Sequence, residues 1–298
     1  MTWNINDARD QKGRIAIVTG SNIGLGYDTA LALAGKDCRL VLACRNMDKA
    51  KAAQRQILVR YPKAHIECQT LDLSSLKSVR SFATTFLKSH KKLDLLINNA
   101  GIMMPPYSLS EDGFESQLAA NYLGHFALTG LLLPVLAKTP NSRVVSLSSL
   151  AHNWGEIRFD DLNFKSGYSK RGAYGQSKLA CLMFAYELNR RLQKAGLQTL
   201  SVAAHPGVAA TNLAQHFPRF LTAFFPLVGQ SASSGALPTL YAALGDDIDG
   251  GDYCGPRSMR QMRGAPVKVG STRASKDQEA AKRLWNLSEE LTGVSFLS

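Results

Sequence analysis

The stretch Thr19-Gly-Ser-Asn-Ile-Gly-Leu-Gly26 follows the apolar run Ile15–Thr19 and precedes an amphipathic segment. Glycines at these positions permit a tight turn, and they let backbone N–H groups approach a pyrophosphate. The N-terminus of the following helix adds unpaired N–H groups and a partial positive charge. An ordinary glycine-rich connection is the alternative. The position between the first strand and a helix favours a dinucleotide site, because the binding mechanism requires that order.

Outward from this turn, short β-branched runs alternate with longer segments of helical periodicity up to about residue 255. Apolar strands that alternate with amphipathic helices predict a parallel sheet covered on both faces. No linker or internal repeat divides the pattern. We therefore expect an α/β protein, residues 1–298, with a single Rossmann domain: a doubly wound parallel sheet of about seven strands with helices on both faces. The expected strands lie at 15–19, 39–43, 65–69, 93–97, 143–147 and 199–203, and the expected helices near 25–35, 47–60, 75–89, 111–137, 175–195, 231–244 and 279–291.

The composition is that of a chain that can bury a substantial core. The 298 residues include 35 Lys+Arg and 23 Asp+Glu, which give a net charge of +12. Only 19% of the residues are charged and 45% are hydrophobic, which excludes a disordered basic tail protein. The 24 Gly and 11 Pro exclude a collagen-like or low-complexity chain. The basic residues are scattered and accompany no nucleic-acid-binding motif, so we expect no nucleic-acid partner.

Cysteine usage and the amino terminus suggest a compartment. The five cysteines, at 38, 44, 68, 181 and 254, show no C-x-x-C spacing, so we expect reduced thiols and no disulfide framework. The histidines show no metal-ligand spacing, and we expect no metal. The first residues, MTWNINDARDQKGR, lack the apolar segment of a signal peptide. No run approaches about 18 consecutive apolar residues, so we expect no transmembrane segment. Together these observations predict a cytoplasmic protein.

The residues after the second strand indicate which nucleotide binds. An NAD site has an acidic residue there for the ribose 2′-hydroxyl, whereas an NADP site has a cation for the 2′-phosphate. This chain has Ala43-Cys44-Arg45-Asn46 and no acid. Arg45 can bind a phosphate through two parallel N–H groups, and Asn22 adds a second polar contact. We predict NADP(H) in preference to NAD(H); a solvated loop arginine is the alternative.

Tyr174-Gly-Gln-Ser-Lys178 lies where the helix expected at 175–195 begins. Residues i and i+4 share one face of a helix, so the phenol and the ammonium are neighbours. A nearby cation stabilises the phenolate, which prepares a tyrosine to donate or accept a proton. Alone, this spacing also occurs on solvated helix faces. Its meaning depends on the residues that accompany it.

Five motifs occur in this order along the chain: the glycine turn, Asn98-Asn-Ala-Gly101, Ser148-Ser149, Tyr174-x-x-x-Lys178 and Pro206-Gly207. Together they resemble the short-chain dehydrogenase/reductase family over about residues 14–255, which implies a Rossmann fold with its active site at the carboxyl ends of the strands. Ala-Cys-Arg45, the long segment before the tyrosine and His205-Pro-Gly look most like the retinol dehydrogenase-like branch and its bacterial relatives. Light-dependent protochlorophyllide reductases are close kin, although their segment before the tyrosine tends to be longer.

The resemblance implies a role for each matching residue. Tyr174 would exchange a proton with the substrate oxygen, and Lys178 would bind the nicotinamide ribose. Ser149 would bind the carbonyl oxygen, Asn121 would hold a water that links Lys178 to solvent, and Asp72 would contact the adenine. The implied cofactor contacts are Gly20, Ser21, Asn22, Ile23, Gly24, Leu25, Gly26, Arg45, Asn46, Asp72, Leu73, Asn99, Ala100, Gly101, Tyr174, Lys178, Pro206, Gly207, Val208 and Thr211. The substrate contacts are Met103, Ser149, Ala151, His152 and Phe217.

Two features near these residues leave alternatives open. Ser148 and Ser149 both follow a strand, and the resemblance favours Ser149. Residues 150–173 separate Ser149 from Tyr174, so this segment must loop out and return. It forms either one rim of the substrate pocket or a surface excursion packed on its own aromatic residues.

The stretch 213–228 contains four phenylalanines and two prolines. Such a segment predicts an apolar substrate lid over about 208–230, which favours a lipophilic substrate. A contact in a homo-oligomer or a membrane-surface patch is the alternative, because exposed apolar area marks some interface. Residues 256–298 are expected to form a C-terminal extension.

We therefore predict an enzyme, an NADP(H)-dependent oxidoreductase. It transfers a hydride between the nicotinamide and a carbonyl or alcohol group of a hydrophobic small molecule, with Tyr174 as general acid/base. Two alternatives remain: a light-dependent protochlorophyllide-type double-bond reductase, and a non-catalytic NADP-binding scaffold or sensor.

Overall fold

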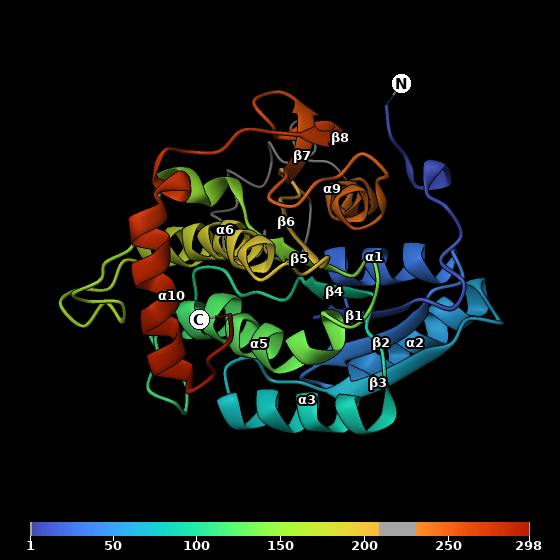
Figure 1. The fold of residues 1–298 in the computed structure, drawn as a ribbon, viewed down its shortest axis with the longest axis horizontal. Coiled ribbons are helices and arrows are strands. Elements are labelled where there is room, and N and C mark those ends of the chain that lie inside the picture. The colour runs from blue at the N-terminus through green and yellow to red at the C-terminus, as the bar shows by residue number, and fades with distance from the viewer. Residues whose placement is uncertain (1, 209–230, 298) are drawn as a thin grey trace.

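An eight-stranded sheet forms the centre of the computed structural model, which describes residues 2–208 and 231–297. The strand order is β3-β2-β1-β4-β5-β6-β7-β8 (Figure 1). The first seven strands are parallel, and β8 pairs antiparallel with β7. The strand order reverses between β1 and β4, where open α/β sheets bind their ligands. The strands are β1 (Ile15–Thr19), β2 (Arg39–Cys44), β3 (Ile66–Thr70), β4 (Leu95–Asn98), β5 (Arg143–Leu147), β6 (Leu200–Ala204), β7 (Tyr253–Ser258) and β8 (Arg263–Lys268).

Helices cover both faces of the sheet, because alternate strand residues are apolar on each side. In β1, Ile15 and Ile17 pack with α3, α5, α6 and α10 on one face, whereas Ala16 and Val18 pack with α1, α2 and α9 on the other (Figure 1). This is the three-layer arrangement that parallel strands require. The helices are α1 (Gly24–Ala34), α2 (Met47–Arg60), α3 (Leu76–Ser89), α4 (Ser116–Leu118), α5 (Gly124–Leu136), α6 (Lys170–Lys194), α9 (Ala232–Leu244) and α10 (Gln278–Thr292).

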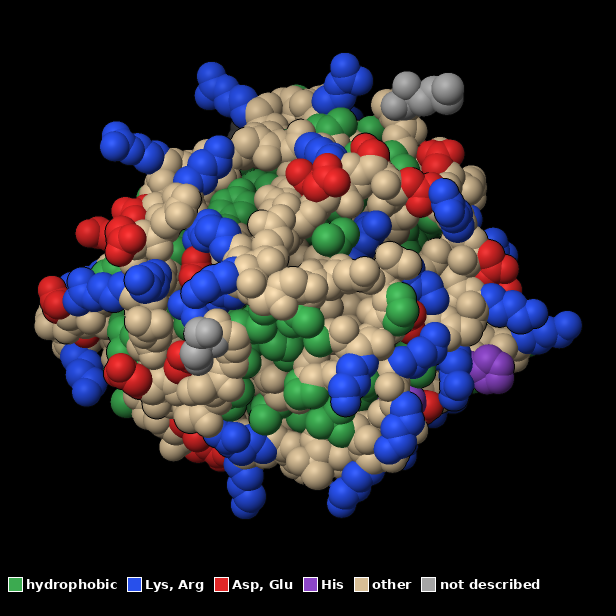
Figure 2. Space-filling view, viewed as in Figure 1, with side chains coloured by type: hydrophobic (Ala, Val, Ile, Leu, Met, Phe, Trp, Pro, Cys, Tyr) green, Lys and Arg blue, Asp and Glu red, His purple; other side chains and the backbone are tan. Residues whose placement is uncertain are grey.

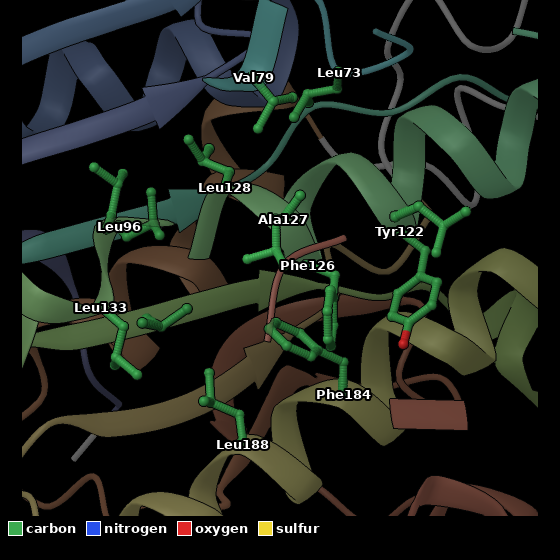
Figure 3. Close-up of a cluster of buried hydrophobic side chains, with 14 of the residues drawn as sticks. Leu73, Val79, Leu96, Tyr122, Phe126, Ala127, Leu128, Leu133, Phe184 and Leu188 are labelled. Carbon is green, nitrogen blue, oxygen red and sulfur yellow. The ribbon is translucent and has the colours of Figure 1, made fainter. Parts of the chain in front are cut away.

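Aromatic side chains bind the two long helices α5 and α6 to the C-terminal helix. Phe126 of α5 faces Phe184 of α6 with ring centroids 5.6 Å apart (Figure 3). Trp285 of α10 lies 5.1 Å from Phe126, and Phe296 lies 4.6 Å from Trp285. Burying side chains of this size contributes roughly 2–3 kcal/mol each. The helix that carries Tyr174 is therefore fixed on a rigid support.

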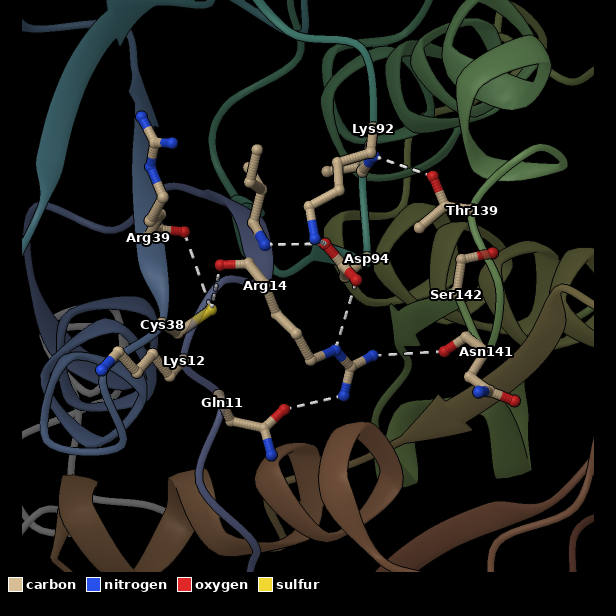
Figure 4. A network of polar contacts seen from close by, with 12 residues as sticks. Gln11, Lys12, Arg14, Cys38, Arg39, Lys92, Asp94, Thr139, Asn141 and Ser142 are labelled. Carbon is tan, nitrogen blue, oxygen red and sulfur yellow. Dashed lines mark hydrogen bonds and ion pairs between the residues drawn. The ribbon is translucent and has the colours of Figure 1, made fainter.

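A polar network joins the amino-terminal ends of β1 and β4, opposite the carboxyl ends of the strands (Figure 4). Asp94 is 5% exposed and accepts the N–H of Ile15 at 2.8 Å. Its carboxylate also pairs with Arg14 at 3.5 Å and with Lys92 at 3.3 Å. Two cations and a backbone donor thus compensate a buried negative charge, as burial requires. This cluster fixes the starts of β1 and β4 and lies far from the glycine turn.

The structure confirms the predicted α/β class and corrects three details. The helix expected at 111–137 is interrupted, because a π-helical turn, Ala119–Leu123 (η2), lies between α4 and α5. Helix α6 begins at Lys170 rather than 175, since the Ser169 side chain caps it by accepting the N–H of Gly172. Tyr174 consequently lies in the second turn. The sheet also has one strand more than the seven expected.

That eighth strand and α10 both come from the segment expected to be a C-terminal extension. Strand β8 belongs to the sheet, and Trp285 of α10 is 1% exposed. Both elements therefore pack onto the sheet and the core of the same domain. Of the predicted lid, about 208–230, all but residue 208 lies outside the described residues. On the face shown in Figure 2, Lys and Arg side chains are spread among Asp and Glu side chains and do not gather into one patch.

Candidate active site

A cleft of about 340 Å³ lies at the carboxyl ends of β1, β2, β3 and β4. It begins where the glycine turn passes into α1, so the N-terminus of that helix faces it. Of the predicted cofactor contacts, the cleft is lined by Gly20, Asn22, Ile23, Gly24, Leu25, Gly26, Arg45, Asp72, Leu73, Asn99, Ala100 and Gly101. It is also lined by residues not predicted, namely Ala43, Cys44, Leu71, Ile102 and Ala120.

Gly26 makes the tight turn possible because nothing larger fits. A Cβ atom there would overlap the carbonyl oxygen of Gly20 and the side-chain amide of Asn99. That amide donates to the carbonyl oxygen of Thr19 at 2.7 Å. The glycine turn is therefore bound directly to the loop that follows β4.

Arg45 and Asp72 lie at the rim of the cleft. The Arg45 side chain is 74% exposed, and its guanidinium lies 3.9 Å from the carboxylate of Asp72. Exposed pairs of this kind contribute little to stability, so Arg45 can leave Asp72 for another anion at small cost. Asp72 is also fixed by Ser74, whose backbone N–H and hydroxyl donate to it at 2.9 and 2.6 Å.

Tyr174 and Lys178 lie on one face of α6, as their spacing predicts. The Lys178 ammonium lies 5.9 Å from the centroid of the Tyr174 ring. Lys178 is 6% exposed, and it donates to the carbonyl oxygen of Leu147, at the end of β5, at 3.1 Å. A nearly buried cation is thus held beside a phenol at the carboxyl edge of the sheet.

Asn121 lies in the π-helical turn, a feature that often marks functional sites. Its amide donates to Ile102 O at 3.0 Å and to Ser177 Oγ at 2.9 Å, while its Oδ1 accepts the N–H of Ile102 at 2.8 Å. A Cβ added to Gly101 would lie 3.1 Å from this Oδ1 and 3.5 Å from Lys178 Nζ. Asn121 therefore joins the loop after β4 to the helix of Tyr174 and Lys178. Its predicted contact with a water stays a prediction.

The two serines after β5 have different environments. Ser148 is 3% exposed and donates to the carbonyl oxygen of Lys178 at 2.8 Å. Ser149 is partly exposed, and its Oγ accepts the N–H of Ala151 at 3.2 Å, which starts the 3-10 helix Leu150–Trp154 (η3). The Ser148 hydroxyl is thus committed to the backbone of α6. The Ser149 hydroxyl only accepts in the hydrogen bond described, so its proton can be donated to a substrate oxygen, as predicted for this serine.

Gly155 and Gly175 let η3 approach α6 next to Tyr174. A Cβ on Gly155 would overlap the carbonyl oxygen of Gly175 and lie 2.9 Å from the Leu179 Cβ. We therefore expect Gly155→Ala to lower the free energy of unfolding by about 2 kcal/mol, as overpacking does, and to lower kcat about tenfold by displacing η3. Urea unfolding and steady-state kinetics measure these effects.

Gly270→Ala is the matched control for Gly155→Ala, since a Cβ there meets nothing within 4 Å. It should change the stability by less than about 0.5 kcal/mol. Equal free energies of unfolding for the two variants would mean that η3 shifts without any loss of stability, which would contradict the prediction.

The turn that begins with Pro206 is held by the connection between β7 and β8. The backbone N–H of Val208 donates to Met262 O at 2.8 Å, and the N–H of Gly207 donates to His205 Nδ1 at 3.2 Å. His205 Nε2 lies 3.1 Å from Gln261 Oε1. Because Nδ1 accepts, Nε2 carries the proton and donates. Burial lowers the pKa of His205 to about 4, which keeps this imidazole neutral.

The remaining predicted contacts lie apart from the cleft or outside the described residues. Ser21 is fully buried, and the Asn46 side chain caps α2 by accepting the N–H of Lys49 at 2.9 Å. Ala151 and His152 are 1% and 2% exposed, so they form the buried side of η3. Met103 is partly exposed in the loop after β4. The described residues contain no group of three or more His, Cys, Asp or Glu that could hold a metal, and Thr211 and Phe217 lie outside them.

Comparisons with known proteins agree with this geometry. The family model for short chain dehydrogenases matches residues 14–220. Human retinol dehydrogenase 13 is 42% identical over 294 residues, which cover 95% of this chain and 85% of that protein. The crystal structure of an uncharacterised protein from Mycobacterium paratuberculosis is 43% identical and has a TM-score of 0.84, with 99% of both chains covered.

The prediction of a cytoplasmic location is wrong, because a similar chain is a chloroplast protein. A chloroplastic short-chain dehydrogenase of Brassica napus, TIC 32 B, is 41% identical over 258 residues, covering 83% of this chain and 81% of that protein. The sequence features on which the prediction was based therefore do not determine the compartment. The span Ser116–Leu136 is long and apolar enough to cross a membrane, although 83% of the window tested is buried inside this protein.

The family follows from three agreeing observations. The sheet has the strand order of a dinucleotide-binding fold, the glycine turn and the Tyr174–Lys178 pair lie at its carboxyl edge, and the family model matches most of the chain. The chain belongs to the short-chain dehydrogenase/reductase family of oxidoreductases, in its retinol dehydrogenase-like branch.

Proposed function

We propose that this protein is an NADP(H)-dependent oxidoreductase that interconverts a carbonyl and an alcohol on a hydrophobic small molecule. One observation carries the proposal: the Lys178 ammonium, nearly buried, lies 5.9 Å from the centre of the Tyr174 ring. The pair places a phenolic hydroxyl and a fixed positive charge together, and Tyr174 would exchange a proton with a substrate oxygen there. Asn121 joins this helix to the loop that lines the cofactor cleft.

Three features of the cleft support a bound dinucleotide. At Gly26 a side chain would block the turn, and the first backbone N–H groups of α1 face the cleft, where a helix end attracts phosphate. Arg45 at the rim supplies a planar guanidinium for a 2′-phosphate. When bound, the nicotinamide would supply or accept the hydride.

This chain's own residues would orient the substrate and move the proton. Tyr174 would donate a proton from its phenolic oxygen during reduction and accept one during oxidation. Lys178 would bind the nicotinamide ribose. Ser149 would donate a hydrogen bond to the substrate oxygen, where negative charge grows during reduction.

The hydrophobic substrate class is supported by the relatives. The proteins that are 39–42% identical to this chain include retinol dehydrogenases 11, 12 and 13, and retinol is an apolar primary alcohol. The apolar sequence 213–228 agrees with a lipophilic substrate.

The direct test is NADPH oxidation, followed by absorbance, with a panel of carbonyl compounds. Lipophilic aldehydes, retinal among them, should be reduced with higher kcat/KM than short-chain polar aldehydes. Tight NADPH binding without turnover of any carbonyl would instead favour the non-catalytic scaffold. A preference for polar aldehydes would contradict the proposed substrate class.

Arg45→Asp is expected to shift the preference from NADPH towards NADH. The substitution removes a charge-assisted phosphate contact and places a carboxylate beside the 2′-phosphate, so the ratio of the two kcat/KM values should fall by about 100-fold. Arg39→Asp is the matched control, since Arg39 is exposed at the other end of the same strand. Equal ratios of the two kcat/KM values for wild type and Arg45→Asp would show that another residue binds the 2′-phosphate.

A further inference from the structure

His125 connects the glycine turn to the catalytic helices, although nothing in the sequence patterns marked it. It is the second residue of α5 and is 4% exposed. Its Nδ1 lies 2.9 Å from the main-chain oxygen of Asn121, and its Nε2 lies 2.9 Å from Thr19 Oγ1. One imidazole thus touches the last residue of β1 and the π-helical turn.

The hydrogen bonds of Thr19 decide which ring nitrogen carries the proton. Its Oγ1 accepts the backbone N–H groups of Asn99 and Ala100, both at 2.9 Å. A hydroxyl oxygen has two acceptor positions, and these donors fill both. The hydroxyl must therefore donate. It faces two acceptors, His125 Nε2 at 2.9 Å and the Ile97 carbonyl oxygen at 3.3 Å, and His125 Nε2 is the nearer. Nδ1 then carries the proton and donates to the Asn121 carbonyl, so the two ends of the ring require the same tautomer.

The same geometry excludes the imidazolium. A proton on Nε2 would face the Thr19 hydroxyl, whose acceptor positions are already filled. Burial, together with the positive charge of Lys178, lowers the pKa of His125 to about 4. The ring therefore remains a neutral donor on one side and a neutral acceptor on the other.

The Asn121 carbonyl, in the π-helical turn, has side-chain donors on two neighbouring helices. It accepts from His125 Nδ1 and also from the Cys181 thiol of α6 at 3.2 Å. The Asn121 side chain meanwhile binds Ile102 and Ser177. His125 is further anchored by Thr129, whose hydroxyl donates to its carbonyl oxygen at 2.7 Å.

We propose that His125 is a positioning residue that sets the spacing between the dinucleotide-binding turn and the turn of Asn121. Through Nε2 it orients the Thr19 hydroxyl that holds the N–H groups of the cleft-lining Asn99 and Ala100. Through Nδ1 it fixes the main chain of Asn121. The inference rests on the proposed function, since both ends of the ring serve the cofactor and the proton-transfer group.

Two substitutions separate the two ends of the ring. In His125→Asn the amide nitrogen takes the place of Nδ1, so the bond to Asn121 is retained and the bond to Thr19 is lost. In His125→Gln the amide oxygen reaches the place of Nε2, and the bond to Asn121 is lost instead. We expect His125→Asn to raise the Kd for NADPH about tenfold with kcat nearly unchanged, and His125→Gln to lower kcat about tenfold with Kd nearly unchanged.

Two readouts do not depend on turnover. Nitrogen-15 NMR of the wild-type protein without cofactor should show a neutral His125 with its proton on Nδ1 from pH 8 to pH 5. Amide hydrogen exchange at Asn99 and Ala100 should be about tenfold faster in His125→Asn than in His125→Gln. His90→Asn is the control, because His90 is buried against Phe86 at the end of α3, and it should leave Kd, kcat and this exchange unchanged.

The inference is overturned if the proton lies on Nε2, or if both variants lose kcat and NADPH affinity to the same extent as they lose stability. Unchanged exchange in both variants would also overturn it. Failure of the proposed function is distinguishable, because wild-type protein would then reduce no carbonyl, whether or not it binds NADPH. The NMR and exchange measurements on the protein without cofactor would still decide the role of His125.

Discussion

Tyr174→Phe is expected to lower kcat by about 10³-fold, within the range for loss of a general acid/base. The substitution removes only the phenolic oxygen. The ring that packs beside Lys178, in a residue that is 7% exposed, is retained. We therefore expect an unchanged melting temperature and an unchanged Kd for NADPH, measured by fluorescence titration, beside the loss of turnover measured by absorbance.

Tyr107→Phe serves as the control for loss of a phenolic oxygen elsewhere. Tyr107 is 43% exposed, in the loop after β4, and its variant should retain wild-type kcat. If Tyr174→Phe keeps its rate within tenfold of wild type, Tyr174 does not transfer the proton. A loss of rate that comes with a loss of NADPH affinity would point to a role in binding instead.

Mild acid is expected to destabilise the protein strongly, because two buried histidines are neutral in the folded state. The pKa values of His125 and His205 fall from 6.5 to about 4, mainly through burial. Between these values the unfolded chain binds more protons than the folded chain. The free energy of unfolding therefore falls as the pH falls from about 6.5 to about 4.

The free energy of unfolding is expected to fall by several kcal/mol between pH 7.5 and pH 5. At pH 5 each of the two histidines lowers the free energy of unfolding by about 2 kcal/mol relative to pH 7.5. Burial also lowers the pKa of His152, which acts in the same direction. Urea unfolding at pH 7.5 and pH 5.0 measures the difference, and the predicted total for His125 and His205 is roughly 4 kcal/mol.

His205→Asn tests the assignment of this effect. Asparagine Oδ1 can still accept the N–H of Gly207 that His205 Nδ1 accepts, but it does not titrate. This variant should lose about 2 kcal/mol less than wild type between the two pH values. Equal stability of the wild-type protein at pH 7.5 and pH 5.0 would mean that these imidazoles are not held neutral.

Most of the sheet could be predicted because buried parallel strands are short apolar runs. The strands Ile15–Thr19 and Arg143–Leu147 and the helix Met47–Arg60 have the predicted bounds, and the other predicted strands differ by one or two residues at their ends. Strand β8 has no such signal. It contains Gly264 and Pro266, which edge strands tolerate, and it pairs only with β7.

The π-helical turn also has no sequence signal. The residues of 111–137 have ordinary helical periodicity, and the extra residue in the turn is fixed by contacts with α6. Its Asn121 binds Ser177 and Cys181, both more than 50 residues away in the sequence. Local propensity therefore predicts the helix, and tertiary packing decides its irregularity.

The class of fold, the glycine turn, the Tyr174–Lys178 spacing and the polar residues at the ends of the strands could all be predicted from local sequence. These depend on neighbours along the chain, because turn conformation and helical periodicity are local properties. Only the tertiary structure decided the partners of those residues. His125 meets Thr19 across 106 residues, and His205 meets Gln261 across 56. A hydrogen bond depends on distances of a few tenths of an ångström, and here the packing of helices against the sheet fixes those distances.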